Sequence, residues 1–181
     1  MVMDAVVAAG THGAARYDSE GALAARGRVS AMDVVDLMKD PWFARTPPKS
    51  TGREVYGAPF VEAFIQRTRG LSLEDRVATA TAFTAESIAA AYRDFVFPRA
   101  AIGTVIVAGG GARNQTLLRM IQERLPAGTS VTTAAAVGVP DLSREAMAFA
   151  VLGHESLMGR PGNLPAATGA RAPVVLGSIT L

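Results

Sequence analysis

The chain has 181 residues, of which 49% are hydrophobic and 19% are charged, and its formal net charge is +2. These values are typical of a one-domain soluble globular protein, and no apolar run approaches the roughly 18 residues that a membrane span needs. Because the chain has no cysteine and only two histidines, we exclude disulfides, thiol nucleophiles and histidine-rich metal sites. The basic residues are scattered without aromatic residues between them, so we expect a cytoplasmic protein that binds neither nucleic acid nor a membrane.

The pattern mixes helices and strands along the whole chain. The pattern predicts a helix over residues 1–9, a β-hairpin over 15–25, a helix over 30–39, a polar loop over 46–56 and a long helix over 72–95. Ser30 and Ser72 are placed to cap the second and third helices, because a serine oxygen can accept a hydrogen bond from the free N–H groups of a first turn. Pro41 limits the second helix at its C-terminal end.

The most informative segment follows the long helix. Residues 105–107 are apolar and β-branched and predict a buried strand, and the glycine loop (residues 109–111) follows at once. Asn114 is placed to cap a helix that runs to Leu125. A strand, a loop without side chains and a helix N-terminus together favour an anion or a nucleotide. The loop is neither a P-loop nor a dinucleotide fingerprint, and a tight turn without a ligand is the alternative interpretation.

The remaining residues complete one α/β unit without repeats or linkers. The pattern predicts a strand over residues 130–133, a helix over 144–158, a loop over 160–169 and a final strand over 174–176.

Four motifs carry a family resemblance. They are Pro-Pro-Lys-Ser-Thr-Gly-Arg-Glu (47–54), Ala-Gly-Gly-Gly-Ala-Arg-Asn (108–114), Ser-Arg-Glu-Ala-Met-Ala-Phe-Ala (143–150) and Gly-Arg-Pro-Gly-Asn-Leu-Pro (159–165). In this order they resemble the C-terminal half of anhydro-N-acetylmuramic acid kinase. The resemblance implies a ribonuclease-H-like lobe of the actin, hexokinase and heat-shock-chaperone superfamily, an α/β fold with a mixed sheet flanked by helices. Residues 1–181 would form the C-terminal, nucleotide-binding lobe of a two-lobed sugar kinase.

The resemblance also implies a reaction. Such kinases hydrolyse the 1,6-anhydro ring of anhydro-N-acetylmuramic acid and phosphorylate O6 from ATP with Mg²⁺, which gives N-acetylmuramic acid 6-phosphate in peptidoglycan recycling. The family's catalytic aspartate lies in an Asp-Thr-Gly-Pro-Gly-Asn motif of the N-terminal lobe, and this motif is not within the 181 residues. We therefore expect the chain by itself to be inactive, to need that lobe as a partner, and to self-associate through the surface that the lobe would cover.

The same resemblance suggests roles for individual residues near the nucleotide. Gly109, Gly110 and Gly111 would lie against the adenosine and its phosphates. Asn114 would contact the nucleotide, although capping a helix is an adequate structural reason for an asparagine there.

Other residues are candidates on the sugar side. Glu145 would be the catalytic residue of this lobe and would orient the sugar or the attacking water; alternatively, it only complements the N-terminus of its helix. Lys49, Ser50 and Arg53 would bind the substrate, with the two cations holding its carboxylate or a phosphate. A simply solvated loop is the alternative for residues 46–56.

Two other functions stay open. The chain could be a non-catalytic nucleotide-binding or regulatory module derived from that lobe, or part of another sugar kinase of the superfamily. The motifs at residues 47–54 and 159–165 argue against the second of these.

Overall fold

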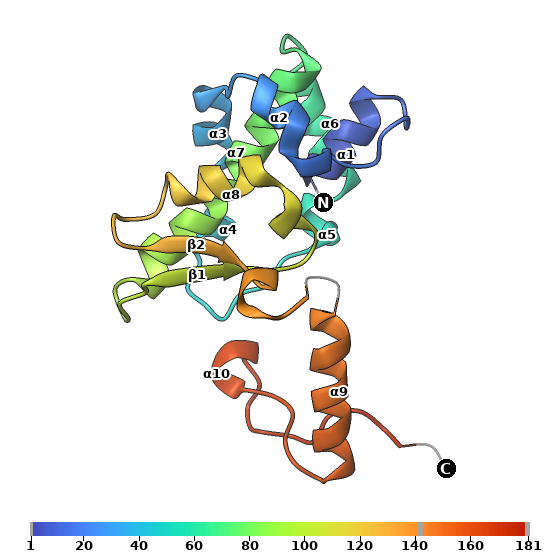
Figure 1. Cartoon of the computed structure of the whole chain (residues 1–181), viewed down its shortest axis with the longest axis vertical. Coiled ribbons are helices and arrows are strands. Elements are labelled where there is room, and N and C mark those ends of the chain that lie inside the picture. The colour runs from blue at the N-terminus through green and yellow to red at the C-terminus, as the bar shows by residue number, and fades with distance from the viewer. Residues whose placement is uncertain (1, 141–142, 180–181) are drawn as a thin grey trace.

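The computed structural model describes residues 2–140 and 143–179. Its helices are α1 (Val2–Gly10), α2 (Ala22–Arg26), α3 (Ala31–Leu37), α4 (Pro41–Ala44), α5 (Arg53–Tyr56), α6 (Ala58–Arg67), α7 (Leu73–Ala91), α8 (Gln115–Gln122), α9 (Arg144–Leu157) and α10 (Pro165–Thr168) (Figure 1). The strands are β1 (Thr104–Val107) and β2 (Ser130–Thr133). Short 3₁₀ helices cover Ser19–Gly21, Gly110–Arg113 and Ala135–Val137, and a π-helix over Tyr92–Val96 continues α7.

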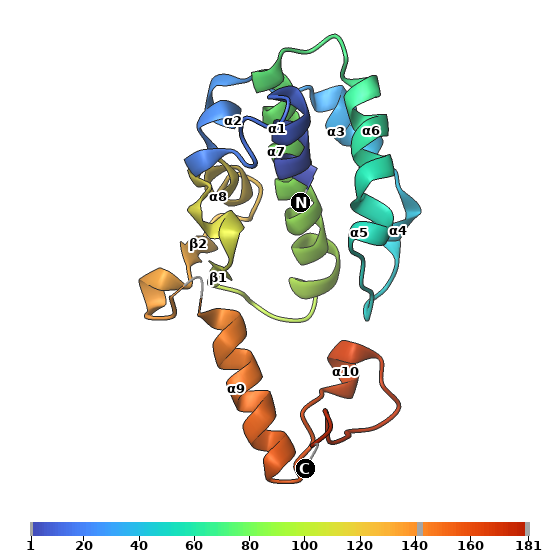
Figure 2. The same cartoon turned by 90° about the vertical axis from the view of Figure 1, so that its right-hand side faces the viewer.

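Helix α7 is the centre of the core, and α1, α2, α3 and α8 pack around it (Figures 1 and 2). It presents many small buried residues, including Ala78, Ala82 and Ala85, each with 0% exposure. Small side chains let the neighbouring helices approach closely, so one helix can bury several partners. Ser72 caps α7 by accepting from the N–H of Asp75 over 3.1 Å, as the sequence predicted.

The two predicted strands form, and they pair in parallel with Thr104 opposite Ser130 and Val107 opposite Thr133. Helix α8 makes the crossover between them. Val105 is 3% exposed, whereas Ile106 is 53% exposed, so the sheet buries one of its faces and the prediction that residues 105–107 are all buried is wrong. The described residues therefore contain a small parallel sheet flanked by helices, and the antiparallel strands of the expected mixed sheet are not among them.

The predicted hairpin over residues 15–25 is wrong. The segment forms the 3₁₀ turn Ser19–Gly21 followed by α2. The Asp18 carboxylate accepts hydrogen bonds from the N–H groups of Leu23 and Ala24, at 2.7 and 3.0 Å, and so satisfies the free donors at the start of the helix. The hydrogen bonds of Asp18 favour a helix here over the hairpin that the sequence pattern predicts.

Four further expectations need correction. Ser30 does not cap α3 with its side chain, because its hydroxyl donates to the Asp33 carboxylate over 2.6 Å. Helix α5 forms inside the predicted loop 46–56, and α10 forms inside the predicted loop 160–169. The predicted strand over residues 174–176 does not form. Val174 instead receives a hydrogen bond from the N–H of Gly162 and donates to the Asn163 side chain, at 3.1 and 2.7 Å. An isolated extended segment without a neighbouring strand has no ladder to join.

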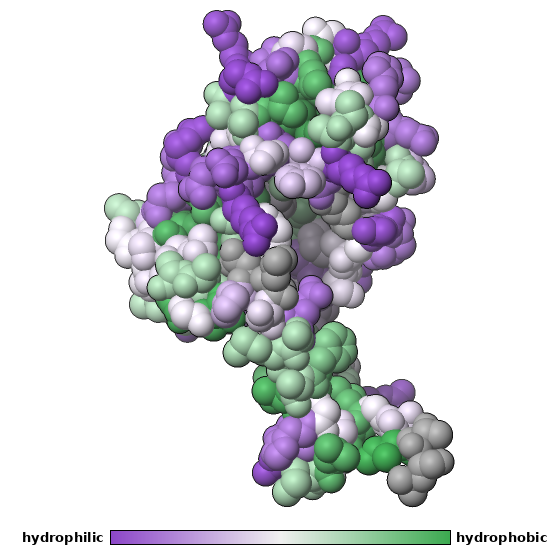
Figure 3. Space-filling view, turned by 45° about the vertical axis from the view of Figure 1, so that its right-hand side comes forward, coloured by the Kyte–Doolittle hydropathy of each residue, from purple (hydrophilic) through white to green (hydrophobic). Residues whose placement is uncertain are grey.

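Helices α9 and α10 lie apart from the helical body (Figures 1 and 2). Their segment exposes many large apolar side chains, and Figure 3 shows this lower part of the molecule as largely hydrophobic. The exposed large apolar residues of this segment include Met147, Phe149, Val151, Leu157, Met158, Leu164, Val174 and Val175. A surface of this kind usually marks an interaction site. Within the described ranges, no helix has the length and apolar character needed to cross a membrane.

Candidate functional site

A cleft of about 1120 Å³ opens beside the glycine loop. Residues 110–115 line one side of it, and residues 16–20, which we call the 16–20 turn, line the other. Side chains from α1 and α7, among them Met3 and Ile88, contribute to its base. The cleft therefore joins segments that are about a hundred residues apart in the chain.

The glycine loop presents bare backbone to this cleft. Gly109 has φ +80° and ψ −168°, a conformation that is essentially restricted to glycine. A Cβ atom added at Gly109 or Gly110 would meet no protein atom within 4 Å, whereas one at Gly111 would lie 3.5 Å from Leu117. Gly110, which lines the cleft, is thus open there, and a ligand can approach its main chain; the space beside Gly109 is equally open, but Gly109 is not among the residues that line the cleft.

Asn114 has the structural role that the sequence predicted. Its Oδ1 accepts a hydrogen bond from the N–H of Leu117 over 2.8 Å, which caps α8, and the residue is 7% exposed. Asn114 also lines the cleft, so the same residue caps α8 and borders the cavity. Its contact with a nucleotide stays a prediction, since the cap already engages its side-chain oxygen.

The 16–20 turn was missed as part of the site, because the segment was interpreted as a hairpin. The N–H bonds that Asp18 accepts from α2 fix the turn, and Tyr17 stays 64% exposed. Glu20 has φ +56°, a left-handed conformation that is uncommon outside glycine. An aspartate a few residues before an alanine-rich run was the available signal of a helix start.

Glu145 lies in the first turn of α9 and is exposed. It is not among the residues that line the cleft beside the glycine loop. A carboxylate is favourable at this helix position in any case. The structure does not place Glu145 in that cleft, and the catalytic role of Glu145 stays a prediction.

Lys49 makes its hydrogen bonds to residues close to it in the chain. Its Nζ donates to the carbonyl oxygens of Trp42 and Phe43, at 3.1 and 2.6 Å, and lies 4.5 Å from the centre of the Trp42 ring. Burial, followed by the charge of Arg45, lowers the pKa of the Lys49 ammonium below its usual value. These contacts hold Lys49 against an aromatic cluster, as expected for a packing role.

The other two candidates of this loop are solvent-exposed. The carbonyl of Ser50 accepts a hydrogen bond from the Trp42 indole over 3.3 Å, and Arg53 begins α5. Like Lys49, neither lines the cleft beside the glycine loop. Their binding of substrate stays a prediction.

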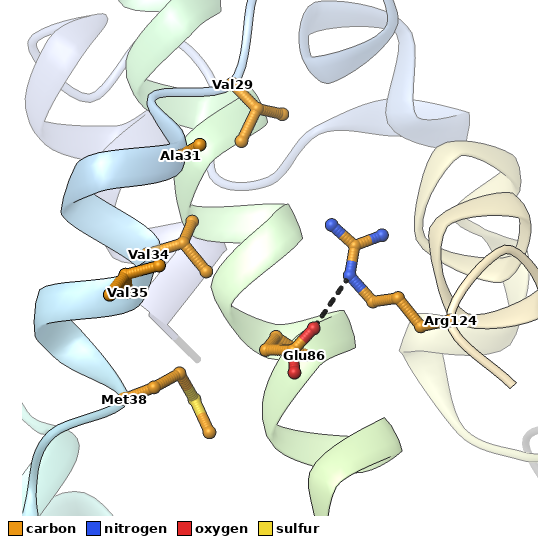
Figure 4. Close-up of a pocket in the computed structure, with 7 residues that line it drawn as sticks. All are labelled: Val29, Ala31, Val34, Val35, Met38, Glu86 and Arg124. Carbon is orange, nitrogen blue, oxygen red and sulfur yellow. Dashed lines mark ion pairs between the residues drawn. The ribbon is translucent and has the colours of Figure 1, made fainter.

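A second hollow, of about 390 Å³, lies between α3, α7 and the end of α8 (Figure 4). Its wall on α3 is apolar, with Val34, Val35 and Met38 among its residues. An ion pair joins Glu86 and Arg124 on its other side, with 3.2 Å between Oε2 and Nε. None of the predicted site residues lies there, so the larger cleft is the candidate functional site.

The expected cofactors are ATP and Mg²⁺, and the features of the cleft fit the nucleotide. The backbone at Gly110 is open, so an anionic ligand can reach it close to the N-terminus of α8, which Asn114 caps. Within residues 2–140 and 143–179, no group of three or more acidic, histidine or cysteine side chains is gathered to hold a metal ion. The described part of the chain thus offers no protein cage for Mg²⁺, which commonly binds through substrate phosphates and one or two carboxylates.

Comparison with known proteins gives one consistent result. The family model for anhydro-N-acetylmuramic acid kinase matches residues 1–181. The anhydro-N-acetylmuramic acid kinase of Caldanaerobacter subterraneus subsp. tengcongensis is 42% identical over 183 residues, which cover 100% of this chain and 46% of that protein. The Salinibacter ruber enzyme of the same name is 42% identical, over 92% of this chain and 42% of its own length. The Streptomyces coelicolor enzyme of that name is 40% identical, over 99% and 44%.

The chain thus spans less than half the length of these curated relatives. The match over its full length, together with relatives at this level of identity, means that the chain belongs to the anhydro-N-acetylmuramic acid kinase family.

Proposed function

We propose that the chain is the nucleotide-binding lobe of an ATP-dependent kinase that hydrolyses the 1,6-anhydro ring of anhydro-N-acetylmuramic acid and phosphorylates O6. The observation that carries this proposal is the cleft in which the glycine loop presents open backbone at Gly110. Family membership supplies the reaction. ATP as phosphoryl donor places the proposed reaction in the cytoplasm, and anhydro-N-acetylmuramic acid as substrate places it in peptidoglycan recycling.

The lobe supplies only part of the chemistry. Phosphoryl transfer depends on positioning and on stabilising charge more than on covalent chemistry, and two lobes that close on ATP would provide both. A fold of the actin and hexokinase type is consistent with the parallel strands and the helices that flank them. The relatives are about twice as long as this chain, and the N-terminal half would contribute the aspartate that takes a proton from the attacking water.

Two features of the chain are consistent with a partner, the N-terminal half, that would cover part of its surface. The exposed apolar residues of α9 and α10 would pack against the N-terminal half, and would cause self-association when it is absent. Closure of the lobes would also bring Glu145 and the cations Lys49 and Arg53 toward the sugar, with Mg²⁺ carried on the nucleotide phosphates.

The test compares the chain with an enzyme rebuilt by joining it to the N-terminal half of the Caldanaerobacter relative. We expect ATP-dependent formation of sugar 6-phosphate from the rebuilt enzyme and none from the chain by itself. Stoichiometric product from the isolated chain would contradict the division of roles. Nucleotide binding without any turnover by the rebuilt enzyme would favour the alternative, a non-catalytic nucleotide-binding module.

The same enzyme tests Glu145. Glu145→Gln keeps a hydrogen-bonding group but removes the charge and the capacity to accept a proton. We expect kcat to fall by about a hundredfold or more if the carboxylate assists proton transfer, with ATP affinity unchanged. Kinetics equal to the parent would leave Glu145 as a charge at the helix end.

A further inference from the structure

The two walls of the cleft are joined by one buried side chain. Thr116, 5% exposed in the first turn of α8, donates a hydrogen bond from Oγ1 to the carbonyl oxygen of Gly21 over 2.8 Å. Gly21 directly follows the 16–20 turn. Thr116 is not itself among the residues that line the cleft. Any influence of its hydroxyl on a ligand must therefore pass through the segment that it holds.

The contact at Gly21 is close. Gly21 is buried with φ +77°, and a Cβ atom there would overlap the side-chain oxygen of Asn114 and lie 2.9 Å from the Cβ of Thr116. Any larger residue would push the 16–20 turn away from α8. The width of the cleft is thus set by direct packing between its walls.

The middle of the turn is also fixed. Asp18, 6% exposed, uses both carboxylate oxygens to accept N–H groups of α2. Between these two attachments Glu20 is held in its left-handed conformation, although it is not glycine. Such outliers persist where the surroundings over-determine them, and they gather at ligand sites.

The turn also offers groups that suit a nucleotide. Arg16 and Tyr17 line the cleft and are exposed, and within the described residues neither has an ion pair or a ring contact. A guanidinium can donate two hydrogen bonds to phosphate oxygens, and an aromatic ring can stack on a base.

We propose that the 16–20 turn is the second nucleotide-contacting wall of the cleft, and that Thr116 is a positioning residue that sets its distance from the glycine loop. The inference rests on the proposed function and deepens it, because it assigns nucleotide affinity to a segment outside the glycine loop. Thr116 acts through Gly21 and touches no reacting atom.

The first test measures ADP binding and steady-state kinetics in the rebuilt two-lobed enzyme. Thr116→Val removes the hydroxyl with little change of shape, and we expect ADP affinity to fall and the KM for ATP to rise by about fivefold, as for one lost buried hydrogen bond. The value of kcat should stay within about twofold of the parent, because no reacting group changes. Thr116→Ser, which keeps the hydroxyl, should restore the affinity.

Thr68→Val is the matched control. Thr68 is 1% exposed, and its hydroxyl donates to the carbonyl of Phe64 over 2.7 Å at the end of α6, where no residue lines the cleft. It should lose stability without losing ADP affinity. An unchanged ADP affinity in folded Thr116→Val, or an equal loss in Thr68→Val, would overturn the inference.

Hydrogen exchange of the unsubstituted enzyme gives a second measurement that does not depend on how the variant folds. Addition of ADP should slow amide exchange both at residues 109–115 and at residues 16–21. Slowing at residues 109–115 without slowing at 16–21 would refute the second wall while leaving the proposed function intact. Slowing at neither segment would refute the nucleotide site itself, and the inference with it.

Discussion

Gly110→Val should weaken nucleotide binding while leaving the chain folded. A Cβ atom at Gly110 meets no protein atom within 4 Å, and the backbone there does not have a positive φ, so the three added carbons project into open cleft. They occupy the space through which a phosphate or ribose would reach the main chain. We expect ATP affinity to fall by at least about tenfold, which is about 1.4 kcal/mol. Stability should change by less than about 1 kcal/mol, because no core contact is lost.

Gly109→Ala is the matched variant with the opposite signature. Its φ of +80° and ψ of −168° strain any residue with a Cβ, although the space beside it is also open. We expect a stability loss of about 1–3 kcal/mol. Isothermal calorimetry with ATP and thermal unfolding, on both variants in the rebuilt enzyme, separate the two effects. Unchanged affinity in a well-folded Gly110→Val enzyme would remove the glycine loop from the nucleotide site.

Two further predictions concern the helical body. Gly27→Ala would place its Cβ against the backbone at the start of α7, so we expect the free energy of unfolding in urea to fall by about 3 kcal/mol or more. Gly70→Ala is the control: its Cβ would meet open space, and it should lower the free energy of unfolding by less than about 1 kcal/mol. Equal losses in the two variants would refute the packing argument. Hydrogen bonds from Lys39 and then Arg67 lower the pKa of Asp36, so their stabilising effect is full above the ordinary pKa of 3.8 and is lost as the pH falls below it. The variant Arg67→Met should therefore lose less stability, relative to the parent, in acid than at neutral pH. A loss that is the same at both pH values would contradict a stabilising ion pair between Arg67 and Asp36.

The parts of the fold that sequence predicted correctly are those with local causes. The cap at Ser72 and the cap at Asn114 each depend on residues within one turn of one another. Their hydrogen bonds and apolar periodicity are decided by neighbours in the chain, so the printed sequence carries the whole signal. The four motifs likewise determined the family without any coordinates.

The shape of the cleft was decided only by tertiary structure. The 16–20 turn owes its conformation to Asp18 locally but its position to Thr116, which lies 95 residues after Gly21 in the chain. Lys49 donates hydrogen bonds to the carbonyl groups of Trp42 and Phe43, partners that the sequence pattern does not indicate, and its binding of an anion stays a prediction. A polar side chain takes whichever partner the folded chain brings within about 3 Å, and no periodicity in the sequence encodes that choice. The sequence determined which chemical groups this protein has, and packing determined which of them face the same cavity.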